Sequence, residues 1–87
     1  MKIEELVALT DGLSVPCGGS TLVCDRTRIV PLADDAVDVK FVIAGTDCVP
    51  KIRLRREQIA RATSEDVARI VRHVARNAIG AAPHFRS

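Results

Sequence analysis

Apolar and polar side chains alternate most regularly over residues 37–43, near the middle of the chain. One set of alternate positions holds the larger apolar side chains, Val37, Val39, Phe41 and Ile43. Because successive side chains of a strand point to opposite faces, this row would share one face of a sheet. The pattern therefore predicts a strand whose apolar face forms part of the core.

A second strand is predicted over residues 21–30, which are rich in apolar and β-branched residues around a polar centre at 25–28. We expect one long strand, because this centre has no Gly or Asn to supply the positive φ of a tight hairpin. A hairpin there, which would give a fourth strand, is the alternative. Pro31 would end the strand and Ala33–Asp35 would make the next turn. Residues 14–20, with one proline and two glycines, are predicted to be loop.

A third strand is predicted at residues 51–55, where Ile52 and Leu54 alternate with cations. Pro50 comes directly before it and has no N–H, which a strand in the interior of a sheet would need for hydrogen bonding. Proline and a row of charges are typical of a strand at the edge of a sheet. We therefore expect Lys51, Arg53 and Arg55 to share one face of an edge strand.

Helical spacing marks both ends of the chain. Ile3 and Leu6 predict a short helix near residues 2–11, which Gly12 would end. A longer helix is predicted from an apolar stripe, which consists of Val67, Ile70, Val71, Val74 and Ala78. Residues 63–66 would provide its N-cap and acidic first turn, and Gly80 would end it.

A short helix at residues 56–62, anchored by Ile59, is predicted before the long one. A single unbroken helix over 57–79 is the alternative. Both terminal helices need the apolar face of one sheet, so the order predicts a two-layer α+β domain over residues 1–80. Its sheet would be a three-stranded antiparallel meander, or a four-stranded one in the alternative, with the C-terminal helix packed on one face. Residues 81–87 are expected to form a flexible tail.

Composition limits this domain to one aliphatic core. The chain has 87 residues, 47% of them hydrophobic and 28% charged, and it has no Trp or Tyr. A core of this kind would gain from further burial against a partner subunit. The acidic N-terminus, the lack of a long apolar run and the odd number of cysteines, three, predict a cytoplasmic protein with no membrane association.

Charge is distributed unevenly along the sequence. Residues 1–47 carry four bases against eight acids, a net −4, whereas residues 48–87 carry nine bases against three acids, a net +6. The candidate binding surface is basic and comprises Lys51, Arg53, Arg55, Arg69, Arg72, His73 and Arg76. Its helical members stand at i, i+3, i+4 and i+7, on one side of a helix, and arginines there could bind phosphates. The competing interpretation, which the pattern favours, is a solvated outer face.

Other kinds of chemistry find little support in the sequence. Its helix–three-strand–helix order resembles the topology of double-stranded RNA-binding domains, but Glu65 and Asp66 stand where those domains have lysines, so no family is assigned. The spacing of the three cysteines is not that of a zinc site. Cys17 and Ser20 lack the setting of a nucleophile elbow. We predict no catalytic residue, no metal site and no cofactor.

The sequence thus predicts a non-enzymatic, cytoplasmic interaction or regulatory module. Its partner would be another protein or a second copy of the chain in a homodimer. Electrostatic binding of nucleic acid through the basic C-terminal half is the alternative.

Overall fold

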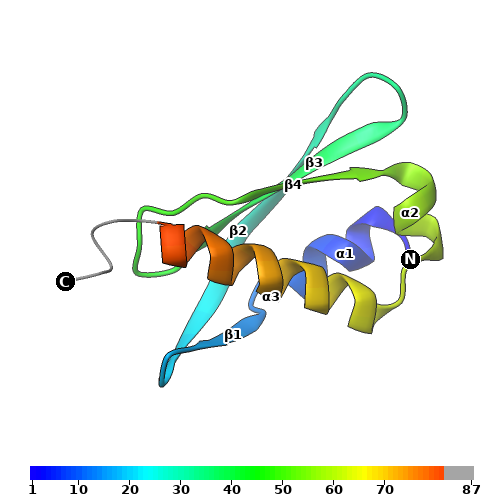
Figure 1. Cartoon of the computed structure of the whole chain (residues 1–87). Helices are drawn as coiled ribbons and strands as arrows, with labels where there is room; N and C mark the ends of the chain where they lie inside the picture. Colours follow the sequence, from blue (N-terminus) through cyan, green and yellow to red (C-terminus); the bar gives the residue numbers. More distant parts are fainter. Residues whose placement is uncertain (82–87) are drawn as a thin grey trace.

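Four antiparallel strands form one curled sheet in the computed structural model, which describes residues 1–81. The strands lie in the order β1-β2-β3-β4, and Figure 1 shows the helices gathered on one side of them. The elements in chain order are α1 (Ile3–Thr10), β1 (Ser14–Cys17), β2 (Ser20–Pro31), β3 (Ala36–Ile43), β4 (Lys51–Arg55), α2 (Arg56–Arg61) and α3 (Ser64–Ala81). The predicted α+β class and the helix packed on one sheet face are confirmed, with four strands.

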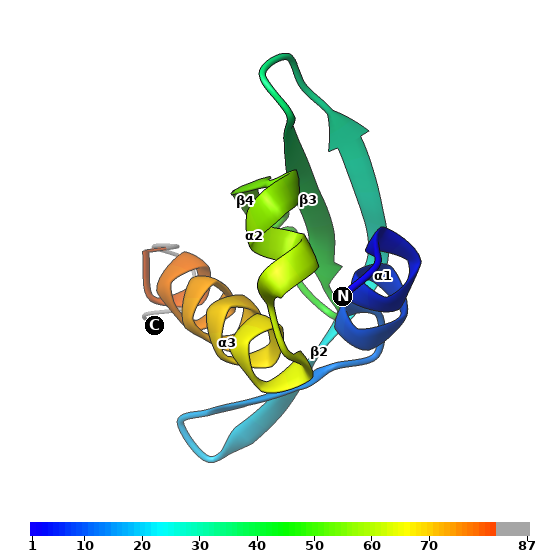
Figure 2. The ribbon, with the colours of Figure 1, turned by 90° about the vertical axis from the view of Figure 1, so that its right-hand side faces the viewer.

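The core lies between the sheet and the three helices. Figure 2 shows α1, α2 and α3 in front of the same face of the sheet. The buried apolar residues are Leu6, Val15, Cys24, Val37, Val39, Phe41, Ile43, Ile52, Ile59, Val67, Val71 and Ala75. The alternation along β3 is thus confirmed, since its four inner side chains are all at most 1% exposed. Ile70, from the predicted stripe of α3, lies at the border of the core and is 38% exposed.

The predicted loop at residues 14–20 is wrong, because this segment forms β1 and the turn into β2. Gly18 and Gly19 have φ of +56° and +86°, the positive values that a two-residue hairpin turn requires. Cys17 pairs with Ser20 across this turn. Pro16 is tolerated because β1 is an edge strand, where a missing N–H breaks no ladder hydrogen bond.

The single long strand predicted over residues 21–30 is confirmed as β2, which serves two neighbours. Its first part pairs with β1 and its second part with β3. One extra residue is inserted in β2 between Asp25 and Arg28, and Arg26 takes a φ of +51° there. Arg26 thus adopts a positive φ although residues 25–28 contain no Gly or Asn. Asp11 Oδ1 accepts the Thr27 N–H at 3.2 Å, which ties the end of α1 to this bulge.

The break between the last two helices is also confirmed, since Ala62 and Thr63 separate α2 from α3. Thr63 Oγ1 accepts the Asp66 N–H at 3.2 Å, and Asp66 Oδ2 accepts the Thr63 N–H at 3.1 Å, so the predicted N-cap is a reciprocal capping box. The prediction that Gly80 ends the helix is wrong, because α3 continues to Ala81. Residues 82–87 of the predicted tail lie outside the described residues.

Candidate cationic surface on the sheet

The face of the sheet that points away from the helices is the candidate site. Because Val39 and Phe41 point into the core, Asp38, Lys40 and Val42 of the same strand point to the opposite face. No helix of residues 1–81 covers this outer face. It therefore remains open to a partner.

Three cations stand side by side across this outer face. Arg28 of β2 is the direct neighbour of Lys40 on β3, and Lys40 is the direct neighbour of Lys51 on β4. We call these three residues the cationic row. Like charges directly opposite each other on a sheet destabilise it, so the row would gain from an anion. Among residues 1–81 no carboxylate lies within 4.0 Å of Arg28 or Lys40.

Asp38 neutralises only one end of this surface. Its side chain is 6% exposed and lies beneath two cations of β4. Arg53 Nε donates to Asp38 Oδ1 at 3.1 Å, and Lys51 Nζ lies 4.0 Å from Asp38 Oδ2. One carboxylate therefore interacts with two cations, with Arg53 through a hydrogen bond and with Lys51 at longer range. It leaves the side chains of Arg53 and Lys51 more than half exposed to an incoming ligand.

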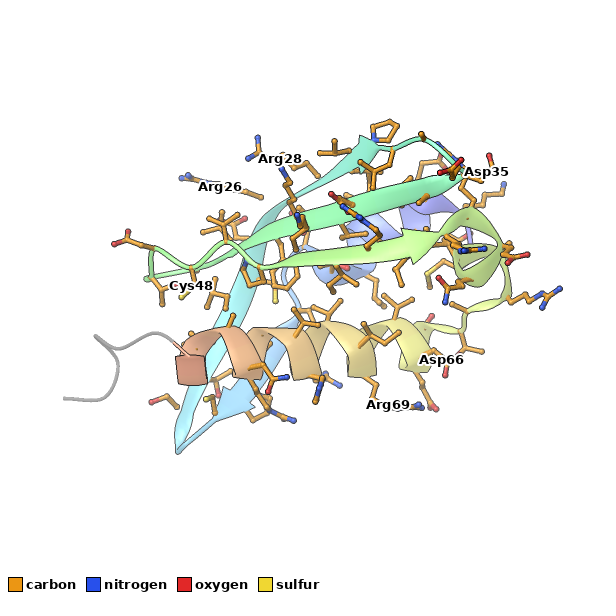
Figure 3. All side chains as sticks on the ribbon, turned by 45° about the horizontal axis from the view of Figure 1, so that its top comes forward. Arg26, Arg28, Asp35, Cys48, Asp66 and Arg69 are labelled. Carbon is orange, nitrogen blue, oxygen red and sulfur yellow. The ribbon has the colours of Figure 1, made fainter. Side chains whose placement is uncertain are left out.

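Aliphatic side chains continue the surface next to the cationic row. A shallow hollow of about 230 Å³ is lined by Arg26, Arg28, Phe41, Val42 and Val49. Val49 is 52% exposed, the highest value among the large aliphatic residues described. Figure 3 shows Arg26 and Arg28 extending from β2 on the side away from α3. A surface that combines cations with apolar side chains suits an acidic peptide, which can supply both carboxylates and apolar side chains.

The structure separates the two halves of the predicted basic surface. Lys51, Arg53 and Arg55 lie on β4, whereas the four helical residues lie on α3, at the other face of the sheet. Arg72 Nε donates to the Ser14 carbonyl at 3.1 Å, and Arg76 Nε donates to the Pro16 carbonyl at 3.0 Å. These two arginines therefore bind backbone carbonyls at the β1 edge of the sheet.

The other two helical residues of the prediction interact along α3 itself. Arg69 pairs with Asp66 at 3.6 Å, one turn earlier, and both point away from the sheet in Figure 3. His73 Nε2 lies 3.1 Å from Asn77 Nδ2. None of these contacts aims a charge at the outer face.

The cysteine side chains are the remaining candidates for chemistry in the described part of the chain. Cys17, Cys24 and Cys48 are free there, and no group of three His, Cys, Asp or Glu side chains among residues 1–81 could hold a metal ion. Burial raises the pKa of the Cys24 thiol, and the nearby Arg72 cation opposes this with a smaller effect. Cys24 is therefore an apolar core residue at neutral pH. No helix in residues 1–81 is long and apolar enough to cross a membrane.

Sequence reasoning missed Arg28 and Lys40 as members of the site. Each was visible as a cation inside a predicted strand, but only the register of β2 and β3 makes them neighbours. The available signal was that Lys40 alternates with core residues and must face outward. Comparison of the chain with protein-family models, with curated proteins and with solved structures found no match.

Proposed function

We propose that this domain is a protein-interaction module that binds an acidic segment of a partner protein on the outer face of its sheet, without catalysing a reaction. The observation that supports it is the cationic row, in which Arg28, Lys40 and Lys51 adjoin across three strands with little internal neutralisation. A carboxylate-bearing ligand would relieve the repulsion within the row. It would also cover the apolar side chains beside it.

A protein ligand is favoured over nucleic acid by the kind of surface that accompanies the charge. Single-stranded nucleic acid is bound largely by stacking of bases on aromatic side chains. The aromatic residue among residues 1–81 is Phe41, which is 1% exposed. In addition, two arginines of α3 that could serve phosphates are engaged with the backbone of β1. A cytoplasmic location and assembly with a second copy remain parts of the proposal and rest on the sequence alone.

Fluorescence anisotropy with three labelled probes tests this function. The probes are a peptide of Glu and Val, a peptide of Lys and Val of the same length, and a short duplex RNA. We expect the acidic peptide to bind and the basic peptide not to bind. The double variant Arg28→Gln, Lys40→Gln should weaken binding of the acidic peptide roughly tenfold, since each lost contact contributes up to about 1 kcal/mol.

The matched control is the double variant Arg61→Gln, Arg69→Gln. It removes the same charge from exposed positions of α2 and α3, away from the outer face. Its affinity for the acidic peptide should stay within a factor of two. Equal weakening by both double variants would overturn the proposal, because the cations would then act only through the net charge of the whole molecule. Preferred binding of the RNA would overturn it as well.

A further inference from the structure

The sheet has two edges, and they are finished differently. At the β1 edge, the outward carbonyls of Ser14 and Pro16 already accept hydrogen bonds from Arg72 and Arg76. Pro16 also has no N–H to offer. The β1 edge therefore has little capacity left for another strand.

At the other edge, the outward backbone groups of Lys51 and Arg53 on β4 have no backbone partner among residues 1–81. The Phe41 N–H donates to Pro50 O at one end of the β3–β4 ladder, and the Arg56 N–H donates to Asp35 O at the other. Hydrogen-bonded and non-hydrogen-bonded pairs alternate between these ends. Ile52 and Leu54 therefore bond to β3, whereas Lys51 and Arg53 direct N–H and C=O groups outward. No strand of residues 1–81 lies beyond β4.

The outward series of β4 ends at Arg55. The Arg55 N–H donates to Gln58 Oε1 at 2.8 Å, so this group is closed by α2. The open stretch thus spans Lys51 to Arg53, which is long enough for a short strand to form a ladder. Its limits are set by Pro50 on one side and by the Gln58 amide on the other.

The two sides of the open edge differ in chemistry. On the outer face stand Lys51 and Arg53, both more than half exposed. On the helix side, Leu54 is half-buried and Ile70 of α3 is 38% exposed; both line a small apolar gap with Ile52. A strand added to β4 would direct alternate side chains to these two sides. Its acidic residues would meet the cations, and its aliphatic residues would meet Ile70.

We propose that the acidic segment binds as a fifth strand on β4, with carboxylates alternating with aliphatic side chains. This inference rests on the proposed function and places the ligand beside Lys51, the member of the cationic row that lies at the β4 edge. Strand addition of this kind draws affinity from the main chain and specificity from alternate side chains. The cationic row would then continue onto the acidic side chains of the added strand.

A second copy of the chain is the wrong occupant for this edge. Two β4 strands paired antiparallel about a two-fold axis would place residues with outward backbone groups opposite each other. Those residues are Lys51, Arg53 and Arg55, so every such register sets cations against cations. The charge that attracts an acidic strand thereby prevents self-pairing through β4.

Amide hydrogen exchange of the isotope-labelled protein, followed by NMR, tests the mode of binding with an unlabelled peptide in which Glu and Val alternate. On adding this peptide, the outward amides of Lys51 and Arg53 should exchange at least tenfold more slowly. The inward amides of Ile52 and Leu54 are internal controls, because β3 already protects them. Unchanged exchange at Lys51 and Arg53 with the peptide bound would overturn strand addition.

Two further peptides separate this inference from the proposed function. One has the same composition but its Glu and Val residues in two blocks, and the other is the alternating peptide with N-methyl groups on the amides that would face β4. We expect both to bind at least tenfold more weakly than the alternating peptide. If all three bind equally and Arg28→Gln, Lys40→Gln still weakens them, the outer face binds acidic ligands but not as a strand. If none binds, the proposed function itself fails.

Discussion

At the scale of single residues, two threonines show opposite outcomes for a polar side chain in this fold. The Thr46 hydroxyl has backbone partners, because it donates to Ile43 O at 2.7 Å and accepts the Cys48 N–H at 3.1 Å. Thr10 shows the opposite outcome. It is fully buried at the end of α1, and its Oγ1 has no hydrogen-bond partner among the described residues. A buried hydroxyl without a partner loses its hydration and gains nothing in return.

Thr10→Val should therefore stabilise the fold. Valine keeps the shape of the side chain and removes the unpaired hydroxyl, which costs about 1 kcal/mol or more. The free energy of unfolding from urea denaturation should rise by about 1 kcal/mol. Thr46→Val is the matched control and should lower it by a similar amount, since that hydroxyl is satisfied. A destabilised Thr10→Val protein would show that the hydroxyl has a partner in solution.

At the scale of elements, local caps and turns decide where helices and strands begin. The capping box of α3 lets this helix start with two residues between it and α2. Hydrogen bonds from the Thr63 backbone N–H and side chain lower the pKa of Asp66, and the Arg69 cation adds to this. The ionised carboxylate is therefore the form that holds the N-terminus of α3.

This cap predicts an acid-dependent loss of stability. The pKa of Asp66 is lower in the folded than in the unfolded chain, so its contribution is present above the unfolded value, near 4. It is lost as pH falls through the folded value. Thermal unfolding followed by circular dichroism should show a smaller decrease between pH 5 and 2 for Asp66→Asn than for the wild type. Glu65→Gln, on the same turn, is the control and should keep the wild-type decrease.

At the scale of the whole molecule, cations of α3 and cations of β4 lie at opposite edges of the sheet and have different roles. Arg72 and Arg76 cap the carbonyls of β1, while Lys51 and Arg53 stand beside the open edge of β4. An uncapped edge strand is a template for pairing with another chain. Arg72 and Arg76 thus protect the β1 edge against pairing with another chain, whereas Lys51 and Arg53 belong to the candidate binding surface.

Replacing Arg72 and Arg76 should therefore cause self-association. In Arg72→Met, Arg76→Met the carbonyls of Ser14 and Pro16 lose their donors, and β1 becomes available to a second molecule. Sedimentation velocity should show a mass that rises with protein concentration. Arg61→Met, Arg69→Met makes the same chemical change without touching β1 and should sediment as the wild type does. Equal association of the two variants would point to exposed methionine instead.

Much of the fold follows from the sequence because local patterns carry it. The period of two in β3, the apolar stripe of α3 and the Thr63–Asp66 cap each depend on residues within a few positions, and each predicts its element correctly. The missed strand β1 shows the limit of such patterns. Its Pro16 and Gly18 suggest a loop, and only pairing with β2 provides the partner that makes the segment a strand.

The sequence by itself determined the α+β architecture, the core face of β3, most of the core face of α3 and the excess of positive charge in the second half. Tertiary structure alone decided which of those charges form a site. Strand register brought Arg28 and Lys40 next to Lys51, and packing of α3 against β1 turned two predicted ligand-binding arginines toward backbone carbonyls. The reason is physical: burial patterns are read one element at a time, whereas the charge of a surface depends on distances between elements that are remote in sequence.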